Sequence, residues 1–148
     1  MPKQALVIGG TGFLGAAIVR ELRAAGWELT TLARGRQGNP FHDVSLIVAD
    51  RSQPGALAQA IRGRDFDLVV DCAGFQEPDA AAAMEAFTGR IGLYVFISTD
   101  FVYAAAPDAR FPVREDAPKN PELPYAAGKL ACEAALGHAW ETQRFPSV

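Results

Sequence analysis

The sequence predicts one α/β domain in which a doubly wound parallel sheet lies between two layers of helices. Short apolar runs alternate with helical patterns along the chain, which is the order expected of parallel strands with right-handed crossovers. A glycine-rich turn, Gly9 to Gly15, follows the first apolar run. The length of 148 residues suits one core and is short for two ordinary domains, so we expect residues 1–148 to form a single domain.

The first strand and the first helix flank the glycines. Residues 5–8 are an unbroken apolar run, as in a strand that is buried on both faces of a sheet. Leu14, Ile18 and Leu22 then recur every four residues, which places them on one face of a helix. Gly26 supplies a stop for this helix, because glycine readily adopts the left-handed conformation found after helix ends.

The remaining elements repeat the alternation. Further strands are expected at residues 28–33, 44–49, 66–70 and 93–98, and further helices at 52–61, 78–89 and 125–140. Ser52, followed closely by Pro54, is the expected N-cap of the helix that starts there. Five prolines between Ala104 and Pro124 predict a long irregular loop, and such loops are more often functional than mere connections.

Composition argues against several classes of protein. The net charge of −3 gives no basic surface for nucleic acid, and no apolar run reaches the roughly 18 residues of a membrane span. The first residues do not resemble a signal peptide, and Cys72 and Cys132 suit a reduced protein better than a disulfide framework. His42 and His138 lie far apart without metal-ligand spacing around them. We therefore expect a cytoplasmic protein with no nucleic-acid, membrane or metal partner.

The glycine turn predicts a binding site for a dinucleotide pyrophosphate. Its first glycine permits a tight turn, the middle one lets the backbone approach a phosphate, and the last lets helix and strand pack closely. The N–H groups and the positive dipole at the start of the helix favour an anion. A glycine-rich turn without a ligand is the alternative. The expected cofactor contacts in this turn are Gly9, Gly12, Phe13, Leu14 and Gly15.

The end of the second expected strand favours NADP over NAD. A site that prefers NAD usually has an acidic residue there, whereas this chain has Arg34 and Arg36. A guanidinium grips a 2′-phosphate with two hydrogen bonds, although solvated loop charges are the alternative. Asp50 ends the third expected strand, where it would accept a hydrogen bond from the adenine amino group or serve as a turn or cap beside Ser52. Arg51, which follows Asp50, is also an expected cofactor contact.

A helix places Tyr125 and Lys129, four residues apart, on one face. Phenols are poor bases at neutral pH, but nearby cations favour the phenolate. Tyr125 would exchange a proton with a substrate hydroxyl or carbonyl while a hydride moves to or from a nicotinamide. Lys129 would also hold the nicotinamide ribose, and Thr99, just past the fifth expected strand, would polarise the substrate oxygen. A surface tyrosine and lysine on an amphipathic helix are the alternative.

These motifs resemble the extended short-chain dehydrogenase/reductase family, the NAD-dependent epimerase/dehydratase group. The resemblance covers almost the whole chain and implies a Rossmann-type fold, with the cofactor ribose and nicotinamide beside Ala73 and Gly74 and the catalytic hydroxyl on Thr99. The matching motifs are the glycine turn, Asp71-Cys72-Ala73-Gly74, Ser98-Thr99-Asp100-Phe101-Val102-Tyr103, Tyr125 and Lys129. The Arg34-Gly35-Arg36 turn, together with Gly128-Lys129 and Cys132-Glu133 in the last expected helix, resembles a subgroup that includes bacterial sugar-nucleotide epimerase-like proteins and a chloroplast RNA-binding relative.

Three departures from the family pattern bear on function. The sugar dehydratases of the family follow the catalytic threonine with an Asp-Glu pair, whereas Asp100 is followed here by Phe101, which argues against dehydration. Tyr103 is followed by Ala104 where the family usually has glycine. Family members are also much longer than this chain and carry a C-terminal substrate-binding lobe. We expect that lobe to be absent here, whether the chain is a fragment or a natural short form.

The resemblance therefore implies an oxidoreductase or epimerase that uses NADP, or else NAD, on a hydroxyl or keto group. The substrate class is a sugar nucleotide or a similar alcohol. The alternative is a dinucleotide-binding sensor or truncated module without turnover. Family members often dimerise through the helices after the fourth and fifth strands, so a homodimer through 79–87 and 125–140 is a hypothesis. Phe75 is expected to pack in the core, with substrate contact as the alternative.

Overall fold

The computed structural model describes residues 2–36, 38–104 and 112–148 and shows a five-stranded parallel sheet with strand order β3-β2-β1-β4-β5. The order reverses between β1 and β4, which makes the sheet doubly wound, as predicted. Along the chain the elements are β1 (Gln4–Ile8), α1 (Phe13–Ala24), β2 (Glu28–Ala33), β3 (Ser45–Val48), α2 (Ala56–Ala60), β4 (Phe66–Asp71), α3 (Glu77–Phe87), β5 (Ile91–Phe96), the 3-10 helix η1 (Asp100–Val102) and α4 (Pro124–Gln143).

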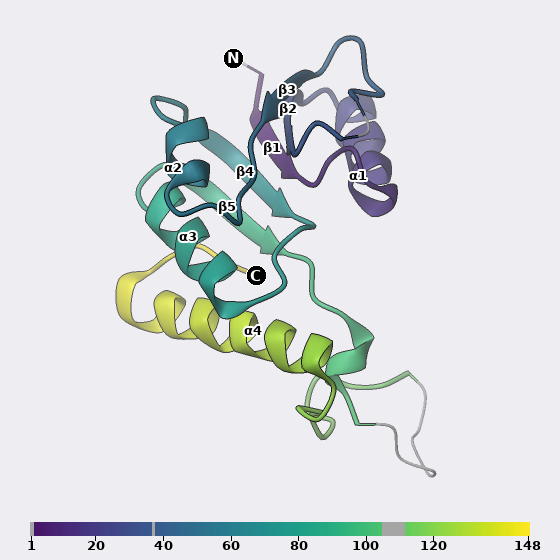
Figure 1. Cartoon of the computed structure of the whole chain (residues 1–148), viewed down its shortest axis with the longest axis vertical. Helices are drawn as coiled ribbons and strands as arrows, with labels where there is room; N and C mark the ends of the chain where they lie inside the picture. Colours follow the sequence, from purple (N-terminus) through teal and green to yellow (C-terminus); the bar gives the residue numbers. More distant parts are fainter. Residues whose placement is uncertain (1, 37, 105–111) are drawn as a thin grey trace.

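Helices cover both faces of the sheet, which confirms the three-layer architecture. Figure 1 shows α1 on one side of the strands and α2, α3 and α4 on the other. Alternate residues of β1 point to opposite faces, as in any strand. Ala5 and Val7 pack in the core that includes Val19 of α1, whereas Leu6 and Ile8 belong to the larger core under the other three helices.

The strand register brings the carboxyl ends of the central strands together. Ile8 of β1 lies opposite Leu32 of β2 on one side and Asp71 of β4 on the other. Asp71 in turn lies opposite Phe96 of β5. Because all these strands are parallel, the loops that follow them emerge at one edge, where open α/β sheets bind their ligands.

Among the described elements, the start of α2 differs most from the boundary expected from the sequence. Ser52 is not an N-cap, because α2 begins at Ala56, after Gly55 in the left-handed conformation (φ 72°). Ser52 instead donates its hydroxyl to Asp50 Oδ1 at 2.7 Å, within the turn that follows β3. The sequence signal of a serine before a proline is shared by such turns and by helix starts, and here the turn prevails.

The long loop predicted between Ala104 and Pro124 lies partly outside the described residues, since 105–111, with Pro107, are not described. The described parts on either side of this gap lie next to each other. Tyr103 and Lys119 form an isolated antiparallel bridge, and Ala104 donates its N–H to Pro118 O at 2.8 Å. The loop therefore returns to η1 before α4 begins.

The last residues lie beside β5. Tyr94 donates its N–H to Pro146 O at 2.7 Å, and Val148 donates its own to Tyr94 O at 2.9 Å. Phe145 is buried, and its ring centroid lies 5.6 Å from that of Tyr94. This segment extends the sheet in parallel beyond β5.

Candidate active site

The glycine turn connects β1 to α1 at the carboxyl edge of the sheet. Gly9 has a φ of 78°, which L side chains rarely adopt, and donates its N–H to Leu32 O at 2.8 Å. A Cβ at Gly15 would lie 2.2 Å from Gly9 O, so only glycine permits this approach of helix and strand. The local geometry therefore has the features that the sequence pattern predicted for a phosphate-binding turn.

The N-terminus of α1 offers backbone donors to an anion. The helical hydrogen bonds begin with the one from Ala16 N to Gly12 O, so the N–H groups of Phe13 and Leu14 precede them. No side chain caps this end, and the first turn contains no acidic residue. The Phe13 side chain is 98% exposed. Within the described residues, neither a capping side chain nor an acidic residue of the first turn compensates the positive end of the helix dipole, which fits a pyrophosphate.

The loops after β2 and β3 bring Arg34, Arg36 and Asp50 to the same edge. Both arginines are exposed. Hydrogen bonds from Ser52 lower the pKa of Asp50, and the positive charges of the two arginines lower it further, so these groups share one electrostatic environment. The turn role suggested for Asp50 is present, with Ser52 N donating to Asp50 Oδ1 at 3.1 Å. Contact of these residues with a cofactor stays a prediction.

The guanidinium of Arg51 points inward. Its Nη1 forms an ion pair with Asp71 Oδ2, its Nη2 donates to Asp79 O at 2.7 Å, and its Nε lies 3.5 Å from Asp79 Oδ1. Burial opposes the charge, but the Asp71 carboxylate outweighs it and raises the pKa of Arg51. The guanidinium is therefore already held by partners within the protein. Contact between Arg51 and a cofactor stays a prediction.

Asp71 lies at the centre of a buried polar cluster that the sequence analysis did not identify. Tyr94 donates its hydroxyl to Asp71 Oδ2 at 2.6 Å, and Ala73 donates its N–H to Asp71 Oδ1 at 2.8 Å. Burial raises the pKa of Tyr94 well above its ordinary value, and the Asp71 charge adds to the effect, so Tyr94 remains a donor. A carboxylate directly after two valines of a buried strand was the available sequence signal.

Lys129 is buried, although lysines are almost always exposed unless they are paired. Its Nζ donates to Gly74 O at 2.7 Å and to Ile97 O at 2.6 Å, and it lies 4.6 Å from the centroid of the Phe96 ring. Burial lowers the pKa of Lys129, and the charge of Asp71 partly offsets this effect. The ammonium therefore joins the loops that follow β4 and β5.

Tyr125 stands at the start of α4 with its side chain half exposed. Its ring centroid lies 6.0 Å from Lys129 Nζ, 6.3 Å from the Phe75 ring and 6.4 Å from the Phe101 ring. Phe75 is 46% exposed, so the expectation that it packs in the core is wrong. The predicted acid/base residue thus faces solvent between two exposed phenyl rings.

Thr99 lies next to this group as the N-cap of η1. Its Oγ1 accepts the N–H of Phe101 at 3.3 Å and is also 3.3 Å from Asp100 Oδ1. The preceding Ser98 donates its hydroxyl to Glu133 of α4. Since Phe101 contacts Tyr125, the structure brings Thr99, Tyr125 and Lys129 to one edge of the sheet, together with Ala73 and Gly74.

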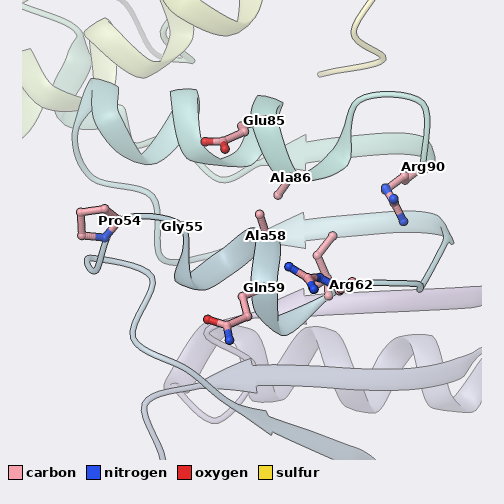
Figure 2. A pocket seen from close by; sticks show the side chains of 9 residues that line it. Pro54, Gly55, Ala58, Gln59, Arg62, Glu85, Ala86 and Arg90 are labelled. Carbon is pink, nitrogen blue, oxygen red and sulfur yellow. The ribbon is translucent and has the colours of Figure 1, made fainter.

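A hollow of about 580 Å³ lies elsewhere, between α2 and α3. Figure 2 shows Pro54, Gln59, Arg62, Glu85 and Arg90 around it. None of the candidate site residues lines this hollow, and its lining includes no nucleophile or paired acid and base. It is therefore separate from the candidate active site.

The described residues contain no metal-binding cluster and no helix suited to span a membrane. No group of three or more His, Cys, Asp or Glu side chains is arranged to hold a metal ion within residues 2–36, 38–104 and 112–148. Across the same ranges, no helix combines the length and the apolar character needed to cross a membrane.

Known proteins with similar sequences include a reductase and an epimerase. The chain is 31% identical over 136 residues to the 2′-dehydrokanamycin reductase of Streptomyces kanamyceticus, a match that covers 91% of this chain and 38% of that protein. It is 30% identical over 163 residues to the UDP-glucose 4-epimerase of Azospirillum brasilense, covering 97% of this chain and 46% of the relative. The chain thus spans less than half the length of these relatives.

Solved structures share the fold. Pal from Bacillus thuringiensis superposes with a TM-score of 0.86 at 23% identity, covering 98% of this chain and 54% of Pal. The UDP-glucose 4-epimerase of Thermus thermophilus, solved in complex with NAD, gives a TM-score of 0.80 at 24% identity, covering 97% of this chain and 53% of the epimerase.

The family assignment rests on nearly the whole chain. Residues 5–148 match the model of the NAD dependent epimerase/dehydratase family. The match includes the glycine turn, the Asp71 to Gly74 segment and the group around Thr99 and Tyr125. The chain therefore belongs to the NAD-dependent epimerase/dehydratase family.

Proposed function

We propose that this chain supplies the cofactor site and the acid/base residues of an oxidoreductase or epimerase that uses NADP, or else NAD. The reaction is hydride transfer at a hydroxyl or keto group of a sugar nucleotide or a similar alcohol. The observation that carries the proposal is the convergence of Thr99, Tyr125 and Lys129 with the glycine turn at one edge of the sheet. The names of the relatives, a reductase and an epimerase, support the same chemistry.

The chain's own groups fit a dinucleotide, because the start of α1 offers uncapped N–H groups and no acidic residue. A nicotinamide cofactor held there would supply the hydride acceptor or donor. Tyr125 moves the proton at its phenol oxygen, and the Thr99 hydroxyl polarises the substrate oxygen. Lys129 has three donors, of which two are used on Gly74 O and Ile97 O, so one remains for a ribose hydroxyl.

The preference for NADP rests on Arg34 and Arg36. Titration of the chain with NADPH and NADH, followed by nicotinamide fluorescence, should give saturable binding with NADPH tighter. Replacing both arginines by serine should weaken NADPH binding about 10- to 100-fold and leave NADH within about twofold, because charge-assisted hydrogen bonds to the 2′-phosphate are lost. Tighter NADH binding would reverse the preference, and no binding of either cofactor would contradict the cofactor site.

The role of Tyr125 separates an enzyme from a binding module. The Tyr125→Phe variant should keep the wild-type affinity for NADPH and lose hydride transfer to or from the substrate, since only the phenol oxygen is removed. A sensor or a module without turnover would keep its function in this variant.

A homodimer through α3 and α4 is also part of the proposal. A clean monomer by light scattering at high concentration would count against it.

A further inference from the structure

We propose that Arg51 is a positioning residue: through Asp71 it fixes the Ala73–Gly74 turn, and through Gly74 it fixes the ammonium of Lys129. The role of Lys129 in holding a cofactor ribose rests on the proposed function. The three contacts Arg51–Asp71, Asp71–Ala73 and Gly74–Lys129 do not depend on the proposed function. In this role the guanidinium of Arg51 acts through contacts within the protein and does not contact a ligand directly.

The first step is the tie between the loop after β3 and the end of β4. The side chains of Arg51 and Asp71 are 9% and 0% exposed, so their ion pair is almost completely shielded from water. The second guanidinium nitrogen donates to Asp79 O at the start of α3. A planar guanidinium held at two points has one orientation, and it transmits that orientation to the carboxylate.

The second step is the tie between Asp71 and the turn that follows it. Asp71 Oδ2 accepts hydrogen bonds from the guanidinium of Arg51 and the hydroxyl of Tyr94, while Asp71 Oδ1 accepts one from the N–H of Ala73. With both oxygens engaged, the carboxylate cannot rotate without breaking a buried hydrogen bond. Gly74 is held just as closely, since a Cβ there would lie 2.9 Å from the Phe96 ring. The backbone of the turn therefore follows the position of Asp71.

The third step connects the turn to Lys129. Gly74 O accepts from Lys129 Nζ at 2.7 Å. A shift of this carbonyl would remove one of the two acceptors that set the direction of the ammonium, the other being Ile97 O. Three contacts in series thus link Arg51, which the sequence places beside the adenine-side Asp50, to the lysine on the nicotinamide side.

Net stability is a poor explanation for this cluster. Desolvating two charges costs about as much as their attraction returns, and apolar replacements of buried ion pairs are often no less stable. A buried guanidinium and carboxylate do supply direction, which apolar side chains do not. This favours orientation of the turn as the purpose of the pair.

The test uses Arg51→Lys, which keeps the charge and loses the planar fork. Hydrogen exchange of the Ala73 amide, followed by NMR without cofactor, should accelerate about tenfold more than that of core amides, as expected for a weakened charge-assisted hydrogen bond. NADPH affinity should fall about tenfold. Arg23→Lys is the matched control, because the Arg23–Asp43 pair is about half exposed, and it should change neither value.

Tyr94→Phe is a second variant, which removes one hydrogen bond to Asp71 without changing the shape of the core. If Arg51→Lys does not fold, this variant tests whether the contacts of Asp71 fix the Ala73–Gly74 turn. Ala73 exchange should accelerate in it as well. Unchanged Ala73 exchange, or equal acceleration of all amides, would overturn the proposal, as would faster Ala73 exchange with unchanged NADPH affinity. If the wild type binds no NADPH, the proposed function fails, and the exchange data still decide whether Arg51 fixes the turn.

Discussion

At the scale of single residues, the carboxyl edge of the sheet is notable for the charged and thiol groups that lie buried beside the Ala73–Gly74 turn. Asp71 and Lys129 both form hydrogen bonds with the Ala73–Gly74 turn, and Cys72 lies next to Asp71 in the chain. Burial and the negative charge of Asp71 raise the pKa of Cys72 to about 11, although the charge of Lys129 acts in the opposite direction. The Cys72 thiol is therefore an inert group despite its place beside the candidate site.

We expect Cys72 to react slowly with thiol reagents. At pH 8 its thiolate fraction is about 100-fold smaller than for a thiol with the ordinary value of 9.0. Iodoacetamide should thus label the folded Cys132→Ser variant about 100-fold more slowly than the same variant in urea. Comparable rates in the two states would contradict the raised pKa.

The same shift predicts a pH dependence of stability. Because the unfolded chain loses the Cys72 proton first, the stabilising contribution is complete below about pH 9 and is lost as pH rises through about 11. The Cys72→Ser variant should lack this component, which urea unfolding at several pH values would measure.

Some features of the candidate site were predictable from local patterns, and others were not. The glycine turn and the Tyr125–Lys129 spacing need only a strand–turn–helix and one helical turn, which a single sequence reveals. The Arg51–Asp71–Tyr94 cluster joins three loops and strands that are far apart in the chain, and no local pattern encodes which buried groups meet. Phe75 was placed in the core by its apolar character alone, whereas its position after β4 leaves it exposed.

At the scale of elements, α4 serves the site at one end and the core at the other. Gly128 lets the helix approach the loop after β4, because a Cβ there would lie 2.3 Å from Phe75 O. Gly137, on the same helix, has nothing within 4 Å of its Cβ position. One helix thus provides a test site and a matched control for the effect of a single methyl group.

We expect Gly128→Ala to push α4 away from this loop, weaken the bond between Lys129 and Gly74 and lower the free energy of unfolding by about 1–3 kcal/mol through overpacking. Gly137→Ala should instead stabilise the protein by about 0.5–1 kcal/mol, because alanine is the better helix former. Chemical denaturation measures both. Equal effects of the two substitutions would show that the close contact at Gly128 does not constrain the helix.

Element prediction succeeded where burial and periodicity agree and failed where two turn signals compete. Strands of a parallel sheet are continuous apolar runs, so the expected strands lie within two residues of the observed ones. The start of α2 was placed at Ser52 although Gly55 precedes the helix, because a serine followed by proline suits both a turn and a helix start. Right-handed crossovers place helices on both faces of a parallel sheet with the observed strand order, but they do not determine that order by themselves.

At the scale of the whole molecule, Phe145 joins the segment after α4 to the larger core. Phe145 is 2% exposed and packs on Tyr94 of β5, while Val148 is 74% exposed. We expect Phe145→Ala to lower the free energy of unfolding by about 3–5 kcal/mol. Val148→Ala should stay within about 0.5 kcal/mol. Urea unfolding compares the two, and a loss below about 1 kcal/mol for Phe145→Ala would exclude this segment from the core.

The strand order also has a consequence for biosynthesis. β1 is translated before both of its neighbours in the sheet; β2 follows it closely, whereas β4, with Leu68 opposite Ala5, follows much later. Until β4 has emerged, β1 presents an unpaired hydrogen-bonding edge and an apolar surface to the cell. The nascent chain is therefore exposed to aggregation and to chaperones for that interval, and the glycine turn after β1 reaches its final surroundings only after β4 has been translated.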